Sequence, residues 1–174
     1  MLRLIIFASV TAGIIIFSWR SLHHWRSHGF FRFFAFESIL ALILLNAEYW
    51  FRDPFAATQI MSWLLLVSSL TMAVAGFYLL GTTGRPQGNI ENTTVLVNRG
   101  AYRYIRHPLY SSLLLMGWGA FFKNPSFLSG VLVVAVSAFL VATARVEEAE
   151  NIKKFGADYP AYMKTTKMFI PFLI

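Results

Sequence analysis

Apolar residues in this chain are gathered into five long blocks separated by polar stretches: Leu2–Trp19, Phe30–Trp50, Ile60–Leu80, Leu109–Phe122 and Phe127–Ala144. A helix needs about 20 apolar residues to cross roughly 30 Å of hydrocarbon. The second and third blocks reach that length, the first and fifth come close, and the fourth is shorter. The pattern predicts an all-α integral membrane protein with five transmembrane helices.

The last two blocks are separated only by the polar turn Lys123–Ser126, which predicts that they form a helical hairpin. After Ala144 the helix is expected to continue to about Phe155, because Gly156 is typical of a helix stop. The segment Asp158–Thr165 is then predicted to form a short cytoplasmic helix, with two tyrosines at helical spacing.

The chain shows no internal repeat and no second domain. We expect residues 1–174 to form a single membrane domain, in which 1–80 supply three spans and 81–174 hold the chemistry. The loop 81–108 is long for a compact protein, and loops of this length are usually functional or disordered. The aromatic and apolar residues near its end favour an ordered loop.

Composition supports a membrane protein over a soluble helical bundle. Hydrophobic residues make up 57% of the chain and charged residues 13%, whereas soluble domains have about 45–50% and about 25%. The chain contains no cysteine, which excludes disulfides, thiolate metal ligands and a cysteine nucleophile.

Positive charges predict the orientation. With five spans, Arg3, Arg52 and Lys123 fall on one side and the other twelve basic residues on the opposite side. Basic residues stay cytoplasmic, so we expect an outer N-terminus and a cytoplasmic C-terminus, in a prokaryotic inner membrane. The net charge of +7 then indicates attraction to anionic lipid rather than to nucleic acid. The twelve residues are Arg20, Arg26, Arg32, Arg85, Arg99, Arg103, Arg106, Arg145, Lys153, Lys154, Lys164 and Lys167.

Two polar clusters at the ends of apolar blocks predict one composite site at the membrane surface. The segment Arg99–Tyr110 contains three arginines, a histidine and three tyrosines, and Arg145–Glu150 directly follows the fifth block. Charged clusters at the ends of spans are costly unless they face water or a ligand.

These clusters carry a resemblance to the isoprenylcysteine carboxyl methyltransferase family. Related motifs occur in phospholipid N-methyltransferases and, more loosely, in membrane sterol reductases. The resemblance covers roughly residues 81–174. The matching elements are Thr94–Val97, Gly100–Tyr102, Arg106–Tyr110, Glu147-Glu148, Phe155-Gly156, Tyr159–Tyr162 and Ile170-Pro171.

The resemblance implies that S-adenosylmethionine binds in a cytoplasmic pocket capped by the last two spans and the C-terminal segment. In eukaryotic members an arginine four residues before the cofactor-binding glutamate contacts the substrate. Here Thr143 occupies that position, and Arg145 is the nearest arginine. By position in the motifs, the cofactor contacts are Gln87, Thr94, Val95, Leu96, Val97, Tyr102, His107, Pro108, Leu109, Tyr110 and Glu147.

The residues themselves are compatible with this cofactor. A carboxylate at Glu147 suits the ammonium group and the sulfonium charge, although it could instead pair with a basic side chain. Adjacent glutamates do not share one helix face, so we expect one of the pair to bind the ligand while the other braces an arginine. The His107-Pro108 pair suits the start of a helix, whose free amides bind anions.

Tyr102 and Tyr110 offer aromatic faces for adenine or the sulfonium. The alternative is that both tyrosines belong to an aromatic belt at the membrane interface.

Methyl transfer from a sulfonium needs few catalytic groups. A carboxylate acceptor is already ionised at neutral pH and requires no general base. A phospholipid amine must lose a proton, which makes His107 or Glu148 a candidate base. Arg106 is a candidate for holding an anionic substrate headgroup.

Glu37, inside the second span, is a second substrate-binding candidate, because intramembrane carboxylates are functional candidates by default. The alternative is that Glu37 pairs with Arg32 or with a neighbouring helix.

The leading hypothesis is therefore a membrane methyltransferase that acts on a lipid-borne acceptor, by resemblance the carboxylate of an isoprenylcysteine-like lipid. The alternative methyl acceptor is a phospholipid amine, which would make the protein a phospholipid N-methyltransferase. An NADPH-dependent membrane reductase and a non-enzymatic membrane protein also remain open. His24 and His28 are four residues apart, but no carboxylate cluster accompanies them, so we predict no metal site.

Overall fold

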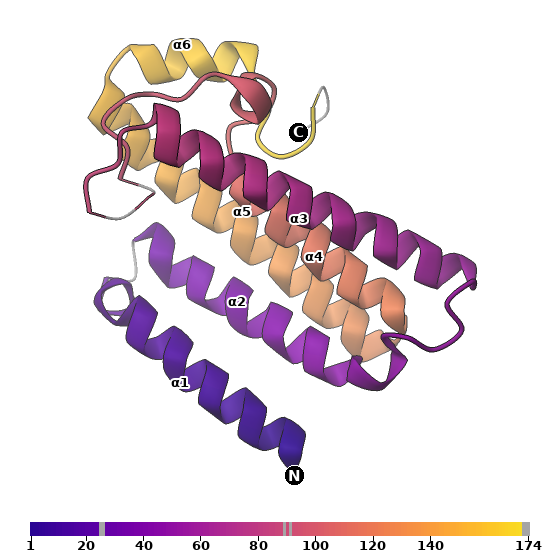
Figure 1. Cartoon of the computed structure of the whole chain (residues 1–174). Coiled ribbons are helices and arrows are strands. Elements are labelled where there is room, and N and C mark those ends of the chain that lie inside the picture. Colours follow the sequence, from indigo (N-terminus) through magenta and orange to yellow (C-terminus); the bar gives the residue numbers. More distant parts are fainter. Residues whose placement is uncertain (25–26, 89, 91, 172–174) are drawn as a thin grey trace. The chain divides into compact units, whose positions relative to one another are not determined.

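A computed structural model describes residues 1–24, 27–88, 90 and 92–171. Arg26, which entered the charge count above, lies outside the described residues. Two isolated β-bridges occur, Pro86 with Thr93 and Ile105 with Lys167, and no longer strand is found in the described part of the chain. The helices in chain order (Figure 1) are α1 (Leu2–Leu22), α2 (His28–Leu45), η1 (Ala47–Tyr49), α3 (Ala57–Thr83), η2 (Gly100–Arg103), α4 (Pro108–Lys123), α5 (Phe127–Phe155) and α6 (Asp158–Thr165).

Four of these helices, α1, α2, α3 and α5, are long and apolar enough to cross a membrane. Helix α3 exposes Leu64, Val67 and Leu70 at helical spacing, as a lipid-facing surface requires. The protein is therefore an all-helical integral membrane protein. Helix α4 has 16 residues, below the usual spanning length, so the count of five spans stays a prediction, as does the orientation.

The chain forms two compact units, which are described separately. Unit 1 consists of Met1–Leu66 and Leu114–Glu147, and unit 2 consists of Val67–Leu113 and Glu148–Ile174.

In unit 1, α1 and α2 lie side by side (Figure 1). The Thr11 hydroxyl on α1 donates a 2.7 Å hydrogen bond to Glu37 Oε2 on α2. The second oxygen, Glu37 Oε1, is buried and meets no donor among the described residues. Of the two readings of Glu37, contact with a neighbouring helix is the one seen, and substrate binding stays a prediction.

Helix α2 ends at Leu45, five residues before the end of the apolar block Phe30–Trp50. The cause is Asn46, which is fully buried. Its side-chain amide donates to the Ala120 carbonyl at 2.9 Å, and its oxygen accepts from the Ser129 hydroxyl at 3.3 Å. A buried amide with these partners holds the chain in place, and the short helix η1 follows.

The predicted hairpin is present within unit 1. The chain leaves α4 at Lys123 and enters α5 at Phe127, and Ala120 and Val133 share a buried apolar cluster with Leu42. A Cβ placed on Gly117 would lie 3.1 Å from Val136 Cγ1, so the two helices approach closely at that glycine.

A buried cation marks the end of this hairpin. The ammonium of Lys123, whose residue is only 3% exposed, lies 3.7 Å from the centre of the Trp63 ring and 5.4 Å from that of Trp50. It donates to the Trp50 carbonyl at 3.2 Å and to Gln59 Oε1 at 3.1 Å. Gln59 Nε2 in turn donates to the Lys123 carbonyl at 3.0 Å. We call Lys123, Trp50, Trp63 and Gln59 the lysine cluster.

In unit 2, the loop after α3 folds back onto the end of that helix. The backbone amides of Thr94 and Val95 both donate to the Gly84 carbonyl, at 2.9 and 3.2 Å. A Cβ on Gly84 would lie 2.5 Å from Thr93 Cγ2, so only glycine allows this approach. Leu80, Val97 and Tyr102 form a buried cluster, as the apolar end of the loop predicted.

The end of α5 and the bounds of α6 match the sequence expectations. Helix α5 ends at Phe155, and Gly156 follows with a φ of 59°, the left-handed conformation of a helix stop. Helix α6 spans Asp158–Thr165 and buries Tyr159 and Tyr162. These tyrosines are the pair whose spacing predicted the helix.

Candidate functional site

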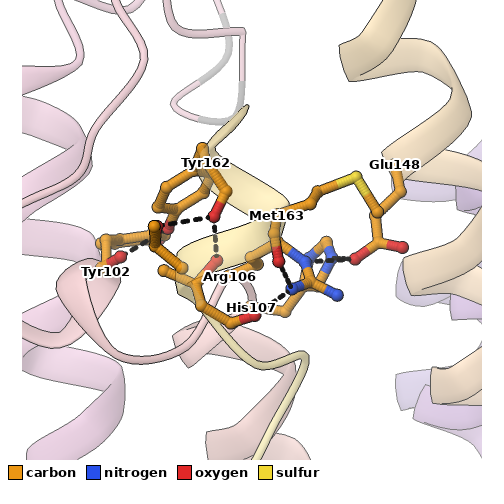
Figure 2. Close-up of polar contacts among 8 residues, drawn as sticks. Tyr102, Arg106, His107, Glu148, Tyr162 and Met163 are labelled. Carbon is orange, nitrogen blue, oxygen red and sulfur yellow. Dashed lines mark hydrogen bonds and ion pairs between the residues drawn. The ribbon is translucent and has the colours of Figure 1, made fainter. Parts of the chain in front are cut away.

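The candidate site in unit 2 is built around a buried charged cluster, Arg106, His107 and Glu148 (Figure 2). Arg106 Nε donates to Glu148 Oε1 at 2.6 Å, and His107 Nε2 lies 3.4 Å from the same oxygen. The side chains of Arg106 and Glu148 are each 10% exposed and that of His107 is 3% exposed. The structure therefore brings together all three residues that the sequence proposed for catalysis.

Arg106 is also bound to the C-terminal segment. Its Nη1 donates to the carbonyls of Thr166, at 2.5 Å, and Met163, at 3.3 Å; Figure 2 shows the contact with Met163. A guanidinium presents a planar fork of donors, and here that fork joins α5 to the end of α6. Arg106 thus acts as a tether, and its expected role in holding a substrate headgroup stays a prediction.

The backbone on either side of this tether is paired. The Arg106 amide donates to the Lys167 carbonyl at 2.7 Å, and the Lys167 amide donates to the Tyr104 carbonyl at 3.0 Å. The His107 amide reaches the Met168 carbonyl at 3.2 Å. The segment after α6 is therefore held against the residues that precede α4.

Helix α4 begins at Pro108 as expected; His107 directly precedes it and Tyr110 lies in its first turn. Their rings are stacked, with centroids 5.4 Å apart and planes inclined by 16°. The ring of Phe169 also lies near the His107 ring, with their centroids 6.1 Å apart. The His107 ring is thus fixed between aromatic neighbours and Glu148, which restricts its orientation.

Tyr102 and Tyr162 connect η2 to α6. The Tyr162 hydroxyl donates a 2.5 Å hydrogen bond to the Tyr102 carbonyl (Figure 2). Burial raises the pKa of the Tyr162 hydroxyl above its ordinary value, so the group remains a protonated donor. This contact and the Arg106 tether together position α6.

A cleft of about 690 Å³ opens beside these contacts in unit 2. Two of the predicted cofactor contacts, Val95 and Leu96, line it. Tyr162 and Thr166 also line it, and these residues hold Tyr102 and Arg106 respectively. The remaining lining residues are Asn98, Arg103, Asp158, Ala161 and Thr165.

Most of the other predicted cofactor contacts lie in unit 2, at varied positions. Tyr102 and Val97 are buried in the cluster with Leu80, and Leu109 packs against it. Thr94 is exposed, and its hydroxyl donates to the Arg85 carbonyl at 2.9 Å. Gln87 is paired through its backbone with Asn92. Arg145 and Glu147 belong to unit 1, where Arg145 is exposed and Glu147 half-buried; their roles in substrate and cofactor binding stay predictions.

Of the adjacent glutamates, Glu148 is the one that braces an arginine. The sequence predicted that one of the pair would do so but did not identify the arginine. The sequence also missed Asp158 and Asn98 as lining residues of the cleft. Asp158 immediately precedes Tyr159, the first residue of the inward-facing tyrosine pair, and that placement was the available signal.

Comparison with known proteins gives the family. The family model described as phospholipid methyltransferase matches residues 57–158, more than half of the chain. The chain belongs to this family. Its membership confirms, at the level of the family, the resemblance carried by the Arg106–Tyr110 and Glu147-Glu148 motifs. The matched range includes α3, α4, α5 and the loop that supplies one side of the cleft.

The chain also resembles curated methyltransferases over part of its length. It is 34% identical over 72 residues to methanethiol S-methyltransferase 2 of Bradyrhizobium diazoefficiens, covering 40% of this chain and 26% of that protein. It is 31% identical over 74 residues to methanethiol S-methyltransferase of Pseudomonas deceptionensis, covering 41% of this chain and 27% of that protein. The aligned part thus spans about a quarter of these relatives' length.

Within residues 1–24, 27–88, 90 and 92–171, no group of three or more histidine, aspartate or glutamate side chains is arranged to hold a metal ion.

Proposed function

We propose that this protein is a membrane methyltransferase that uses S-adenosylmethionine and that the cofactor's adenosine end occupies the cleft of unit 2. The observation that carries the proposal is the cleft itself. Residues that resemble the cofactor contacts of related enzymes, Val95 and Leu96, line it, and its other wall is tethered to the Arg106 cluster through Thr166.

The residues present fit such a cofactor. Small-molecule sites usually enclose about 300–1,000 Å³ and combine apolar walls with a few polar groups, and this cleft has about 690 Å³. Val95 and Leu96 supply apolar surface, while Asn98, Arg103 and Asp158 supply polar groups. When bound, S-adenosylmethionine supplies an electrophilic methyl group on a sulfonium.

The charged cluster favours an acceptor that is already ionised. Glu148 is engaged with Arg106 at 2.6 Å and with His107 at 3.4 Å, so its carboxylate is committed to positioning. A carboxylate acceptor needs no general base, and the chain's residues then act by orienting the acceptor and excluding water. We therefore propose a lipid-borne carboxylate as the acceptor, as in isoprenylcysteine-like lipids. The curated relatives, named methanethiol S-methyltransferases, make a small thiol the second candidate.

The binding experiment fills the cleft with a side chain. Ala161 lines the cleft, whereas Ala157, on the preceding turn, does not. We expect Ala161→Trp to abolish binding of S-adenosylmethionine to the purified protein and Ala157→Trp to leave it intact, as measured by isothermal titration calorimetry. Equal binding by both variants would contradict a cofactor in this cleft.

The acceptor experiment follows the methyl label. The purified protein is incubated with methyl-labelled S-adenosylmethionine and, separately, with a prenylcysteine, a phosphatidylethanolamine and methanethiol. We expect label in a base-labile ester of the prenylcysteine. Label in the phospholipid headgroup or in a volatile sulfide would replace the carboxylate by an amine or a thiol acceptor.

A further inference from the structure

The cleft of unit 2 contains one acidic side chain, Asp158, at the first position of α6. Asp158 is exposed and makes no ion pair with any residue in the described part of the chain. It shares the cleft with Arg103 from η2 and with the apolar residues Val95 and Leu96. The sequence motifs do not assign a role to Asp158 or Arg103.

A carboxylate in this setting is suited to a ligand group that donates hydrogen bonds. An ionised carboxylate only accepts hydrogen bonds, so it pairs with donors such as the two hydroxyls of a ribose. Acidic residues bind ribose hydroxyls in this way in other nucleotide-binding folds. The apolar wall at Val95 and Leu96 is suited to a flat base, and a nucleoside joins a flat base to a diol within one small molecule.

We infer that Asp158 binds the ribose diol of the cofactor and makes the cleft selective for nucleosides that carry both hydroxyls. The inference rests on the proposed function, because it assigns one part of the cofactor to one side chain. It goes further by naming Asp158 as a specificity-determining residue. Placement at the start of α6 links the ribose contact to Tyr162 and Thr166, which anchor the same helix.

The test uses S-adenosylhomocysteine, a stable analogue that keeps the adenosine, and its 2′-deoxy counterpart. Binding of both compounds is measured by calorimetry for the wild type, for Asp158→Asn and for Asp53→Asn. Asp53 is an exposed acid in unit 1 with a φ of 46°, a conformation that asparagine adopts readily. The control variant therefore makes the same change of charge without affecting the fold.

Charge-assisted hydrogen bonds contribute about 1.5–3 kcal/mol, which corresponds to about a tenfold to hundredfold change in affinity. We expect Asp158→Asn to weaken binding of S-adenosylhomocysteine by this factor and Asp53→Asn to leave it unchanged. The wild type should bind the 2′-deoxy compound more weakly by a similar factor. In Asp158→Asn the difference in affinity between the two compounds should be smaller than in the wild type, because the 2′-hydroxyl then meets a neutral amide oxygen in place of a charged carboxylate.

The outcomes separate the two proposals. If the wild type binds S-adenosylhomocysteine and Asp158→Asn binds it equally well, the ribose assignment is overturned and the cofactor proposal stands. If the wild type binds both compounds equally, the assignment is likewise overturned, and this result depends on no variant. If the wild type binds neither compound, the proposed function fails, and the ribose assignment fails with it.

Discussion

Among the described residues, Lys123 in unit 1 and Arg106 in unit 2 are cations with little exposure to solvent, and the two are stabilised by different chemistry. In unit 1 the lysine cluster surrounds an ammonium with two indole rings, a carbonyl and a glutamine oxygen. In unit 2 Arg106 is paired with the carboxylate of Glu148 and with two carbonyls. Lys123 is therefore stabilised by neutral partners, whereas Arg106 is stabilised by a full opposite charge.

The two cations also connect different parts of the protein. Lys123 ends a helix of the hairpin, and Trp50, Gln59 and Trp63 belong to neighbouring segments of unit 1. The lysine cluster therefore locks helix ends. Arg106 instead joins a loop to α5 and to the segment after α6, where Thr166 lines the cleft. The stronger, charge-assisted contact occurs where the backbone has no regular secondary structure to hold it.

The largest expected effect comes from removing the Arg106 guanidinium. Breaking one side of a buried ion pair costs about 3–5 kcal/mol, because the partner is left buried and unpaired. Arg106→Met should lower the free energy of unfolding by that amount and abolish S-adenosylmethionine binding. Thermal unfolding in detergent and calorimetry measure the two effects.

Arg99→Met is the matched control, because Arg99 is an exposed arginine of the same loop and exposed substitutions usually change stability by less than about 0.5 kcal/mol. An Arg106→Met protein as stable as this control would remove the distinction between the two cations.

A smaller effect is expected from Lys123→Met, which keeps the aliphatic bulk and removes the charge. The change leaves Gln59 Oε1 without its donor, at about 1–3 kcal/mol, and loses the attraction to the indole rings, at about 0.5–2 kcal/mol. Part of this loss is offset because a buried ammonium no longer has to be desolvated. Thermal unfolding should show a destabilisation below that of Arg106→Met, while cofactor binding stays unchanged.

Loss of cofactor binding in Lys123→Met would show that the lysine cluster does more than lock helix ends. In that event the contrast between a structural cation and a site-forming cation would have to be abandoned.

The smallest effect is expected at Tyr162, whose hydroxyl supports the same wall of the cleft as Arg106 but without charge. Tyr162→Phe removes the donor to the Tyr102 carbonyl and should destabilise the protein by about 1 kcal/mol near neutral pH. Urea or thermal unfolding in detergent gives this value.

The pH dependence of this variant provides a second readout. Burial raises the pKa of Tyr162 in the folded protein, whereas the unfolded chain loses the same proton near pH 10. The free energy of unfolding should therefore fall as the pH rises above about 10, and its contribution is complete below that value. Tyr162→Phe should show a shallower fall than the wild type. Equal slopes would contradict the buried, protonated state of this hydroxyl.

Particular residues show how much of the fold can be predicted from the sequence. Gly156 and the tyrosine spacing in Asp158–Thr165 predicted the end of α5 and all of α6, because helix stops and one-sided burial are local properties. Asn46 shows the opposite case. It lies inside an apolar block, yet the helix ends beside it, because its side chain bonds to Ala120 and Ser129, residues far along the chain that no local pattern reveals.

The same division applies to the site. The motifs alone identified Arg106, His107 and Glu148 as residues that belong together, since their residue types are conspicuous at the ends of apolar blocks. They did not reveal that Arg106 and Glu148 bind one another, nor that Asp158 and Arg103 line the cleft with Val95 and Leu96.

The sequence by itself determined that this is a helical membrane protein and where most of its helices run, because hydrophobic block length and helix-stop residues act locally. It also determined the family, because the family's motifs can be recognised in the sequence alone. Only the tertiary structure decided which charges are paired and which line the cleft. Those outcomes depend on contacts between residues far apart in the chain, and burial then makes an unpaired charge too costly to leave without a partner.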